Sequence, residues 1–295
     1  MGLRVLARHA IAIVLMGLGY FSPAVASESR TGGKLLLTGG VTSLEGAAGG
    51  GLATWGVIAG DETVDGIGAT AHVTYVPLPD FDLTSYGVAI GIRDRLELSY
   101  AHQSFDTRAA GAALGLGHGF TFAQDVVGAK LRLVGDAVYG QDTILPQIAV
   151  GVQYKLADKA AIITAVGGKA SRGTDFYVTA TKVVLSTSLV LNTTLRFTKA
   201  NQFGLLGFGG DANDAYRPEF EGSAGFLLSR HLLVGGEYRT KPSNLTFAKE
   251  NAAHDLFIAW SPVRHLTATA AYVDLGDIAT VTRQRGAFLS LQVSH

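Results

Sequence analysis

Short segments in which apolar and polar residues alternate recur along almost the whole chain, and this pattern limits what the chain can fold into. Leu96, Leu98 and Tyr100, for example, alternate with charged or hydroxyl residues. A period of two places the apolar side chains of a strand on one face and the polar ones on the other. Segments of about ten residues with this pattern, separated by turn residues, are typical of transmembrane β-barrel strands.

A short apolar run at the N-terminus has the features of an export signal. Arg4 and Arg8 precede the apolar core Ala10–Gly19, and residues 24–26 form an Ala-x-Ala cleavage pattern. The core is too short to cross a membrane as a helix, which needs about 20 residues. We therefore expect residues 1–26 to be a signal peptide cleaved after Ala26, and the remaining chain to be exported to the bacterial outer membrane.

The composition suits an exported barrel better than a soluble enzyme. Gly accounts for 38 of 295 residues and charged residues for 16%, where about 7% Gly and about 25% charged residues are usual. The chain has no Cys, so it forms no disulfide. Its 24 basic and 24 acidic residues balance, which argues against a nucleic-acid partner. A soluble β-sandwich is the alternative, but it would need a contiguous core of large apolar residues.

Tracing strands back from the C-terminus predicts an all-β fold, an antiparallel transmembrane β-barrel of about twelve strands. Their expected cores are Ala69–Val76, Leu83–Ile92, Arg95–Phe105, Phe122–Val134, Ile144–Lys155, Asp175–Leu185, Ser188–Thr198, Pro218–Leu228, Leu232–Thr240, His254–Trp260, Leu266–Val273 and Ala287–His295. Lys34–Val41 and Gly51–Ala59 could add a further pair and make fourteen. We prefer twelve because the Gly-rich stretch between these segments is a weak strand former.

The expected domain division follows from this trace. Residues 69–295 form the barrel, and residues 27–68 form a Gly-rich N-terminal segment that is either a plug-like piece or the first hairpin. We expect Gly39–Gly51 to approach other backbone closely, at the periplasmic end or inside the lumen, because glycine permits close approach and positive φ. The alternative is a flexible linker between the signal peptide and the barrel.

The expected connections differ in length at the two ends of the barrel. Tight turns fall at residues 93–95, 229–231 and 261–265, and long connections fall at Thr107–Gly119, Leu156–Gly173, Gly207–Arg217, Lys241–Ala252 and Gly276–Gly286. Short periplasmic turns and longer extracellular loops are the plan of outer-membrane barrels. Within Leu156–Gly168, Ala-rich apolar spacing predicts a short helix in an outer loop.

Nine charged residues fall on the strand face opposite lipid and are candidates for lining the lumen. They are Arg95, Glu97, Lys130, Arg132, Arg196, Glu219, Glu221, Glu237 and Arg239. On the lipid face near the midplane, a Lys or Arg would cost about 2–4 kcal/mol. Inside, these groups either line a water-filled pore and set its selectivity, or pair across a narrow lumen and plug it. Their mixed signs argue against a strongly anion- or cation-selective porin.

The one arrangement that suggests catalysis is His102 with Ser104. Residues two apart share a strand face, so both lie on the lipid side with Leu98 and Tyr100. Outer-membrane phospholipases carry such a pair with an Asn on a neighbouring strand, and no Asn is near it in this sequence. Polar residues level with lipid headgroups are the simpler interpretation. The His residues are scattered, so we expect no enzyme, no metal site and no cofactor.

Several stretches carry a resemblance to a known family. They are Gly32–Trp55, Arg93–Thr107, Leu145–Lys155, Gly173–Lys182 and Thr198–Asp211. Together they resemble an uncharacterised family of proteobacterial outer-membrane β-barrel proteins that is classed only as a domain of unknown function (DUF). The resemblance covers nearly the whole chain from about Gly32, and it implies the barrel fold without an assigned activity or site. Thr54 and the final His295 depart from the family pattern.

These patterns predict a small-solute channel or passive uptake protein without enzymatic turnover, whose solute the sequence does not name. A structural or surface-interaction barrel that uses the long loops is the alternative, and a lipid hydrolase acting through Ser104 is a further one. The expected partners are outer-membrane lipid and lipopolysaccharide, the barrel-assembly machinery and a small solute.

Overall fold

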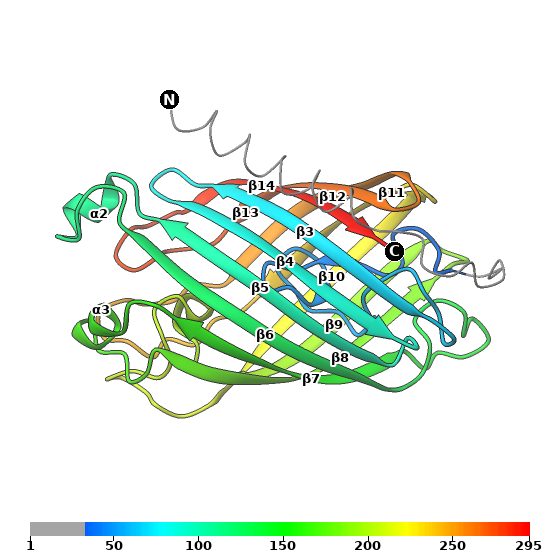
Figure 1. Cartoon of the computed structure of the whole chain (residues 1–295), viewed down its shortest axis with the longest axis horizontal. Coiled ribbons are helices and arrows are strands. Elements are labelled where there is room, and N and C mark those ends of the chain that lie inside the picture. The colour runs from blue at the N-terminus through cyan, green and yellow to red at the C-terminus, as the bar shows by residue number, and fades with distance from the viewer. Residues whose placement is uncertain (1–32) are drawn as a thin grey trace. The chain divides into compact units, whose positions relative to one another are not determined.

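Twelve antiparallel strands close into a barrel in the computed structural model, and each strand pairs with its neighbours along the chain (Figure 1). The structure describes residues 33–295, so the expected signal peptide and its cleavage site lie outside the described residues. Residues 289–294 of the last strand pair with residues 70–75 of the first, and this ring leaves no open sheet edge. The predicted twelve-stranded antiparallel barrel is confirmed, and the fourteen-strand alternative is wrong.

The barrel strands are β3 to β14, and each overlaps one predicted strand core. They span Ile67–Pro77 (β3), Asp82–Ile92 (β4), Leu96–Asp106 (β5), Thr121–Val134 (β6), Gln147–Ala157 (β7), Arg172–Val184 (β8), Leu189–Thr198 (β9), Arg217–Ser229 (β10), Leu232–Arg239 (β11), Ala253–Val263 (β12), Leu266–Asp274 (β13) and Arg285–Ser294 (β14). β7 begins at Gln147 rather than at the expected Ile144, because Pro146 has no N–H to donate to a neighbouring strand.

Alternation along each strand separates an apolar outer face from a polar inner face. On β4, Tyr86, Val88 and Ile90 point outward and are about half exposed, whereas Gly87 and Ala89 between them are buried. The period-two pattern of the sequence therefore becomes an apolar outer surface around the barrel. The inner face is buried as well, which means that something fills the lumen.

The two ends of the barrel differ in their connections. One end, the loop end, carries the connections 78–81, 107–120, 158–171, 199–216, 240–252 and 275–284; the other, the turn end, carries 93–95, 135–146, 185–188, 230–231 and 264–265. Long and short connections separate largely as predicted. The exceptions are the short turn 78–81 at the loop end and the long loop 135–146 at the turn end.

Helices are confined to short pieces in the loops. α2 (Ala110–Ala113) and α3 (Ala160–Ala165) lie at the loop end, at the left of Figure 1. α3 falls inside the stretch for which the sequence predicts a short helix. Among residues 33–295, no helix is long and apolar enough to cross a membrane.

Residues 34–61, the inner segment, fill the lumen (Figure 1, blue trace behind β4 and β5). Both ends of the segment lie at the turn end, where the Lys34 N–H donates to the Asp61 carbonyl and the Asp61 N–H donates to the His295 carbonyl. Residues 41–60 are buried without exception. The two-residue strands β1 (Val41–Thr42) and β2 (Ala48–Gly49) pair with each other and not with the barrel.

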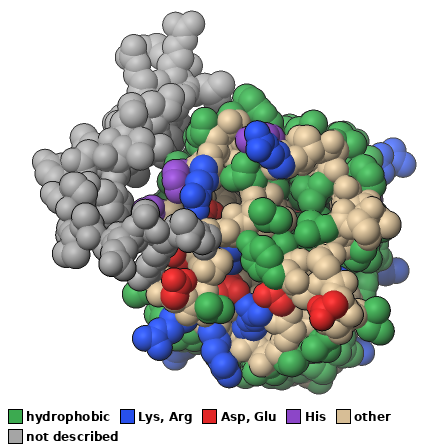
Figure 2. Space-filling model, turned by 90° about the vertical axis from the view of Figure 1, so that its right-hand side faces the viewer, with side chains coloured by type: hydrophobic (Ala, Val, Ile, Leu, Met, Phe, Trp, Pro, Cys, Tyr) green, Lys and Arg blue, Asp and Glu red, His purple; other side chains and the backbone are tan. Residues whose placement is uncertain are grey.

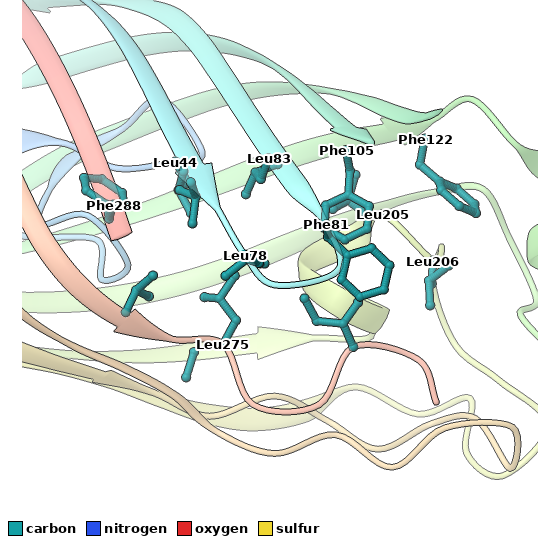
Figure 3. Packing of buried hydrophobic residues seen from close by; sticks show 14 of the residues in the cluster. Leu44, Leu78, Phe81, Leu83, Phe105, Phe122, Leu205, Leu206, Leu275 and Phe288 are labelled. Atoms are coloured by element: carbon teal, nitrogen blue, oxygen red, sulfur yellow. The ribbon is translucent and has the colours of Figure 1, made fainter. Parts of the chain in front are cut away.

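Apolar side chains of the inner segment pack against both the wall and the loops. Leu44 belongs to a buried cluster that continues through Leu83 and Phe81 to Leu205 and Leu206 (Figure 3). A second buried cluster surrounds Trp55, Val57 and Ala59 and reaches Val138 of the long turn-end loop. The segment therefore connects the turn end to the loop end through the interior.

Candidate functional site

Carboxylates on the inner wall bind backbone N–H groups of the inner segment. The bonds run from Ala48 and Ala59 to Glu97 (3.1 and 2.8 Å), from Leu52 to Glu237 (2.6 Å) and from Thr54 to Glu221 (2.8 Å). Because the segment has little regular structure, these bonds satisfy N–H groups that would otherwise be buried without partners. The charged residues that the sequence places inside the barrel thus hold a piece of the same chain.

Donors on the wall bind the carbonyl groups of the same segment. Lys130 donates to the carbonyls of Ala48 (3.0 Å) and Val57 (2.8 Å), Arg239 to Leu52 (3.0 Å), Thr194 to Thr54 (2.6 Å), and Gln147 to Gly56 (2.8 Å). The wall thus presents acceptors, which are glutamates, to the N–H groups of the inner segment, and donors, which are lysine, arginine and neutral polar side chains, to its carbonyl groups. Each wall group is placed to match one main-chain group of the segment.

Glycine in the inner segment makes these close contacts possible. A β-carbon at Gly50 would stand 1.7 Å from Oε1 of Glu237, and one at Gly51 would stand 2.9 Å from the ring of Phe288. At these positions only a residue without a side chain leaves the wall group in place. The Gly-rich composition of this stretch therefore has a steric reason inside the lumen.

Six buried charged side chains, the Glu45 cluster, meet where the inner segment crosses the lumen. Glu45 lies within ion-pair distance of Lys155 (2.5 Å), Arg239 (2.9 Å) and Arg196 (3.5 Å). The same cations contact two wall carboxylates: Lys155 and Arg196 contact Asp175, and Arg196 and Arg239 contact Glu221. Each side chain is at most 6% exposed, so three cations balance three carboxylates away from water.

A second pair of wall carboxylates differs, because it has no cation. Glu237 and Asp255 are direct partners in the β11–β12 register, and both are buried. Among the described residues, no cation lies within ion-pair distance of either one. Glu237 accepts hydrogen bonds from Leu52 and Ser223, but Oδ1 of Asp255 has no hydrogen-bond partner within residues 33–295. Like charges at opposed positions of a sheet are destabilising, so this pair is costly whenever both groups are ionised.

The structure brings together most of the candidate lumen residues. Six are buried in the lumen and contact the inner segment: Glu97, Lys130, Arg196, Glu221, Glu237 and Arg239. Arg132 is partly buried near the turn end, where it pairs with Asp94 and Asp136, and Glu219 is partly buried near the loop end. Arg95 is exposed in the turn before β5, so the structure does not place it in the lumen.

Sequence reasoning missed four ionisable groups of this site. Lys155, Asp175 and Asp255 lie on the inward phase of their strands, so the alternation could have identified them. Glu45 lies in a Gly-rich stretch with no periodicity, and no sequence signal places it beside the wall cations. Among the described residues, no group of His, Cys, Asp or Glu could hold a metal ion.

The loops close the loop end of the lumen over the inner segment. The short 3-10 helix η1 (Asn201–Gly204) folds inward, and the Phe203 carbonyl accepts a bond from Lys155 at 3.1 Å. Lys241 and Glu250 form a buried ion pair at 3.2 Å, and Glu250 also accepts the Gln202 N–H. Burial lowers the pKa of Lys241 and raises the pKa of Glu250, while the charge of each partner opposes the shift.

At the turn end, the loop 135–146 lies beside the inner segment. Asp136 accepts the N–H groups of Val138 (2.8 Å) and Tyr139 (2.7 Å) and pairs with Arg132. Burial alone would raise the pKa of Asp136, but these N–H groups and the Arg132 guanidinium hold the pKa below its usual value. Figure 2 looks onto this end: outside the grey atoms, side chains fill the face, and charged groups gather toward its lower left.

A separate polar group lies on the outer face of the barrel. His102 on β5 points outward, and its Nδ1 lies 2.8 Å from Oδ1 of Asp125, its direct partner on β6. The Tyr100 hydroxyl donates to the same oxygen at 2.7 Å. The sequence has no Asn near His102, and it does not reveal Asp125 as a partner, because strand register is needed to place His102 and Asp125 side by side.

The inner segment and the barrel fall within a single protein family. Residues 38–292 match the family described as "Protein of unknown function (DUF3034)". The chain belongs to this family. The match begins in the inner segment of this DUF3034 protein and ends in β14, so it includes both the segment and the wall that binds it. The resemblance to an uncharacterised barrel family is confirmed. No curated protein matches the chain.

Solved structures of outer-membrane barrels share the fold of this DUF3034 protein. The KdgM porin in complex with disordered oligogalacturonate is 10% identical, with a TM-score of 0.50, over 77% of this chain and 99% of that one. The COG4313 outer membrane channel from Pseudomonas putida F1 is 11% identical (TM-score 0.46; 80% and 97% covered). Outer membrane phospholipase A from Escherichia coli is 7% identical (TM-score 0.42; 76% and 92%). At 10% identity the likeness to the KdgM porin shows the fold alone.

Proposed function

We propose that this protein is an outer-membrane channel for small solutes that the inner segment keeps closed. The observation that carries the proposal is the interface between wall and segment. Wall side chains such as Glu97, Lys130 and Thr194 bind main-chain atoms of the segment by hydrogen bonds. The same side chains can bind water when the segment leaves, so the wall keeps hydrogen-bond partners as the lining of an aqueous passage.

The charged lumen favours a channel over a purely structural barrel. Replacing a buried ion pair by apolar residues of similar volume is often neutral or stabilising. A lumen that never opens therefore gains little from the six charges of the Glu45 cluster. A lumen that alternates between a closed and a hydrated state needs polar walls in both.

The outer surface supports a position in the outer membrane. Outward-facing residues such as Val88, Ile90 and Leu98 are apolar and nearly half exposed, and lipid rather than water suits such a surface. Most short connections lie at the turn end, which we place in the periplasm. The partners we propose are outer-membrane lipid and lipopolysaccharide, the barrel-assembly machinery and the solute.

A disulfide lock tests the channel. The chain has no Cys, and a β-carbon at Gly56 would stand 3.3 Å from Oγ1 of Thr181 on β8 and 2.8 Å from the Gln147 carbonyl oxygen on β7. A cystine can join positions 56 and 181 once the Gln147 carbonyl shifts by a few tenths of an ångström. We expect Gly56→Cys/Thr181→Cys to give current steps in planar bilayers when reduced and none when oxidised. The two single-Cys variants are the matched controls and should conduct under both conditions.

Two results would contradict the channel proposal. Undiminished conductance of the oxidised double variant would show that solutes do not pass along the route that the inner segment occupies. Silent bilayers for the wild-type protein and all variants, with the heat-dependent gel mobility of a folded barrel, would favour the structural alternative.

Lipid hydrolysis is a second candidate function, and one contact favours it. A carboxylate that orients a His beside a Ser is the arrangement of Ser-His-Asp hydrolases, and Asp125 contacts His102 two residues before Ser104. In the part of the chain that the structure describes, no hydrogen bond joins Ser104 to His102, so we rank this function below the channel. Fatty-acid release from phospholipid vesicles that Ser104→Ala abolishes would establish it, and no release by the wild-type protein would remove it.

A further inference from the structure

The Glu45 cluster has the charge and geometry of a binding site for an anion. Lys155 on β7, Arg196 on β9 and Arg239 on β11 converge on one carboxylate, and the inner segment supplies that carboxylate. The wall keeps two carboxylates of its own in the cluster, Asp175 and Glu221. If the segment withdraws, the three cations of the cluster face only Asp175 and Glu221 within ion-pair distance, and the cluster itself carries one uncompensated positive charge.

We propose that this part of the wall is a binding site for a solute with a single carboxylate, which takes the place of Glu45 when the inner segment withdraws. The inference rests on the proposed function, because a solute reaches the site only if the segment moves. Glu45 then acts as a resident occupant that keeps the site neutral in the closed state. Solute and segment compete for the same three cations.

The arrangement favours a monocarboxylate over other solutes. A neutral sugar leaves the positive charge without a partner, and a buried charge without a partner is costly. A dianion overcompensates beside Asp175 and Glu221. The guanidinium groups of Arg196 and Arg239 suit the planar carboxylate, and the rings of Tyr177 and Phe203 lie against them, with centroids 5.0 and 4.5 Å away.

Chemical rescue tests the site directly. Glu45→Ala removes the heavy atoms of one acetate ion from the cluster. We therefore expect the midpoint of thermal unfolding of this variant to fall below that of the wild-type protein. Sodium acetate should then raise the midpoint by about 3–6 °C at ten times its dissociation constant. Sodium chloride and sodium sulfate at the same ionic strength should raise it less.

Matched variants separate binding at the cluster from a general salt effect. Glu237→Ala also removes a buried carboxylate that holds the inner segment, but no cation of the described chain faces it, so acetate should not rescue it. Glu45→Gln leaves no cavity and should not respond either. If Glu45→Ala does not fold in chloride, the same comparison is made as refolding yield with acetate or chloride present, read from gel mobility.

The outcomes distinguish this site from the channel itself. Acetate rescue of Glu45→Ala alone supports the site, and it does so even if no variant conducts, in which case only the channel fails. Equal rescue by chloride or sulfate, or rescue of Glu237→Ala to the same extent, overturns the site. If the reduced Gly56→Cys/Thr181→Cys variant conducts but acetate does not stabilise Glu45→Ala, the channel proposal is retained and the carboxylate site is rejected.

Discussion

At the level of single residues, the closed lumen depends on wall side chains and on the glycines of the inner segment that lie against them. The sequence predicts that Gly39–Gly51 approaches other backbone, and it predicts that Glu237 points inward. It does not predict that Gly50 and Glu237 meet, because they are far apart in the chain and no shared pattern links them. The same holds for Glu45 and Arg239. Whether a strand side chain points inward follows from its neighbours in the sequence, whereas the residues that it contacts in the lumen depend on the whole fold.

We expect Gly50→Ala to destabilise the protein. The new β-carbon would overlap the Glu237 carboxylate that accepts the Leu52 N–H, so the carboxylate must move and this bond is weakened or lost, at a cost of about 1–3 kcal/mol. Gly140→Ala is the matched control, since its β-carbon would have no neighbour nearer than 3.5 Å. Thermal unfolding followed by gel mobility measures both. An unchanged midpoint for Gly50→Ala would contradict the placement.

We expect Asp255→Asn to stabilise the protein. The change removes one of two opposed carboxylates that have no cation in the described chain, which should gain about 1 kcal/mol. Asp175→Asn is the control with the opposite expected sign, because Asp175 pairs with Lys155 and Arg196. The measurement is the midpoint of thermal unfolding in detergent. A lower midpoint for Asp255→Asn would show that this pair holds a partner that compensates its charge.

At the level of elements, the strands were predictable and the loops were not. Alternation with a period of two marks a strand from its own residues, so all twelve strands follow from the sequence, with small shifts such as the start of β7 after Pro146. The loop 135–146 has no such pattern, and its length at the turn end departs from the expected plan. Its conformation depends on tertiary contacts, chiefly those of Asp136 and of Ala137 with β8.

We expect acid to loosen the loop 135–146. The folded-state pKa of Asp136 is lowered, so its contribution to stability is present above the usual Asp pKa of about 3.9 and is lost as the pH falls through the folded-state pKa. Hydrogen exchange of the Val138 and Tyr139 amides, corrected for intrinsic rates, should show less protection at about pH 3 than at pH 5. Asp136→Asn should remove this difference, and a difference that persists would assign it to another group.

At the level of the whole molecule, a closed ring of strands surrounds a segment that depends on the ring for its hydrogen bonds. The alternation shows which face of each strand is inward, but it does not show what occupies the lumen. The sequence therefore did not decide between a water-filled pore and a plugged lumen. The structure has the lumen filled by residues 34–61, which bind the wall through polar contacts. The inner segment needs the barrel for its hydrogen bonds, but strand pairing in the barrel does not need the segment, because every barrel strand pairs within the ring.

We therefore expect the barrel to fold without the segment, but with lower stability. In a variant with residues 38–58 replaced by a short Gly-Ser linker, strand content and heat-dependent gel mobility should be retained, because strand pairing within the ring is unchanged. The midpoint of thermal unfolding should fall by about 10 °C or more, since several wall hydrogen bonds are lost. A synthetic peptide of residues 38–58 should restore part of the loss, and a scrambled peptide should not. Failure of the variant to form a barrel would show that the segment is required for folding rather than for closure alone.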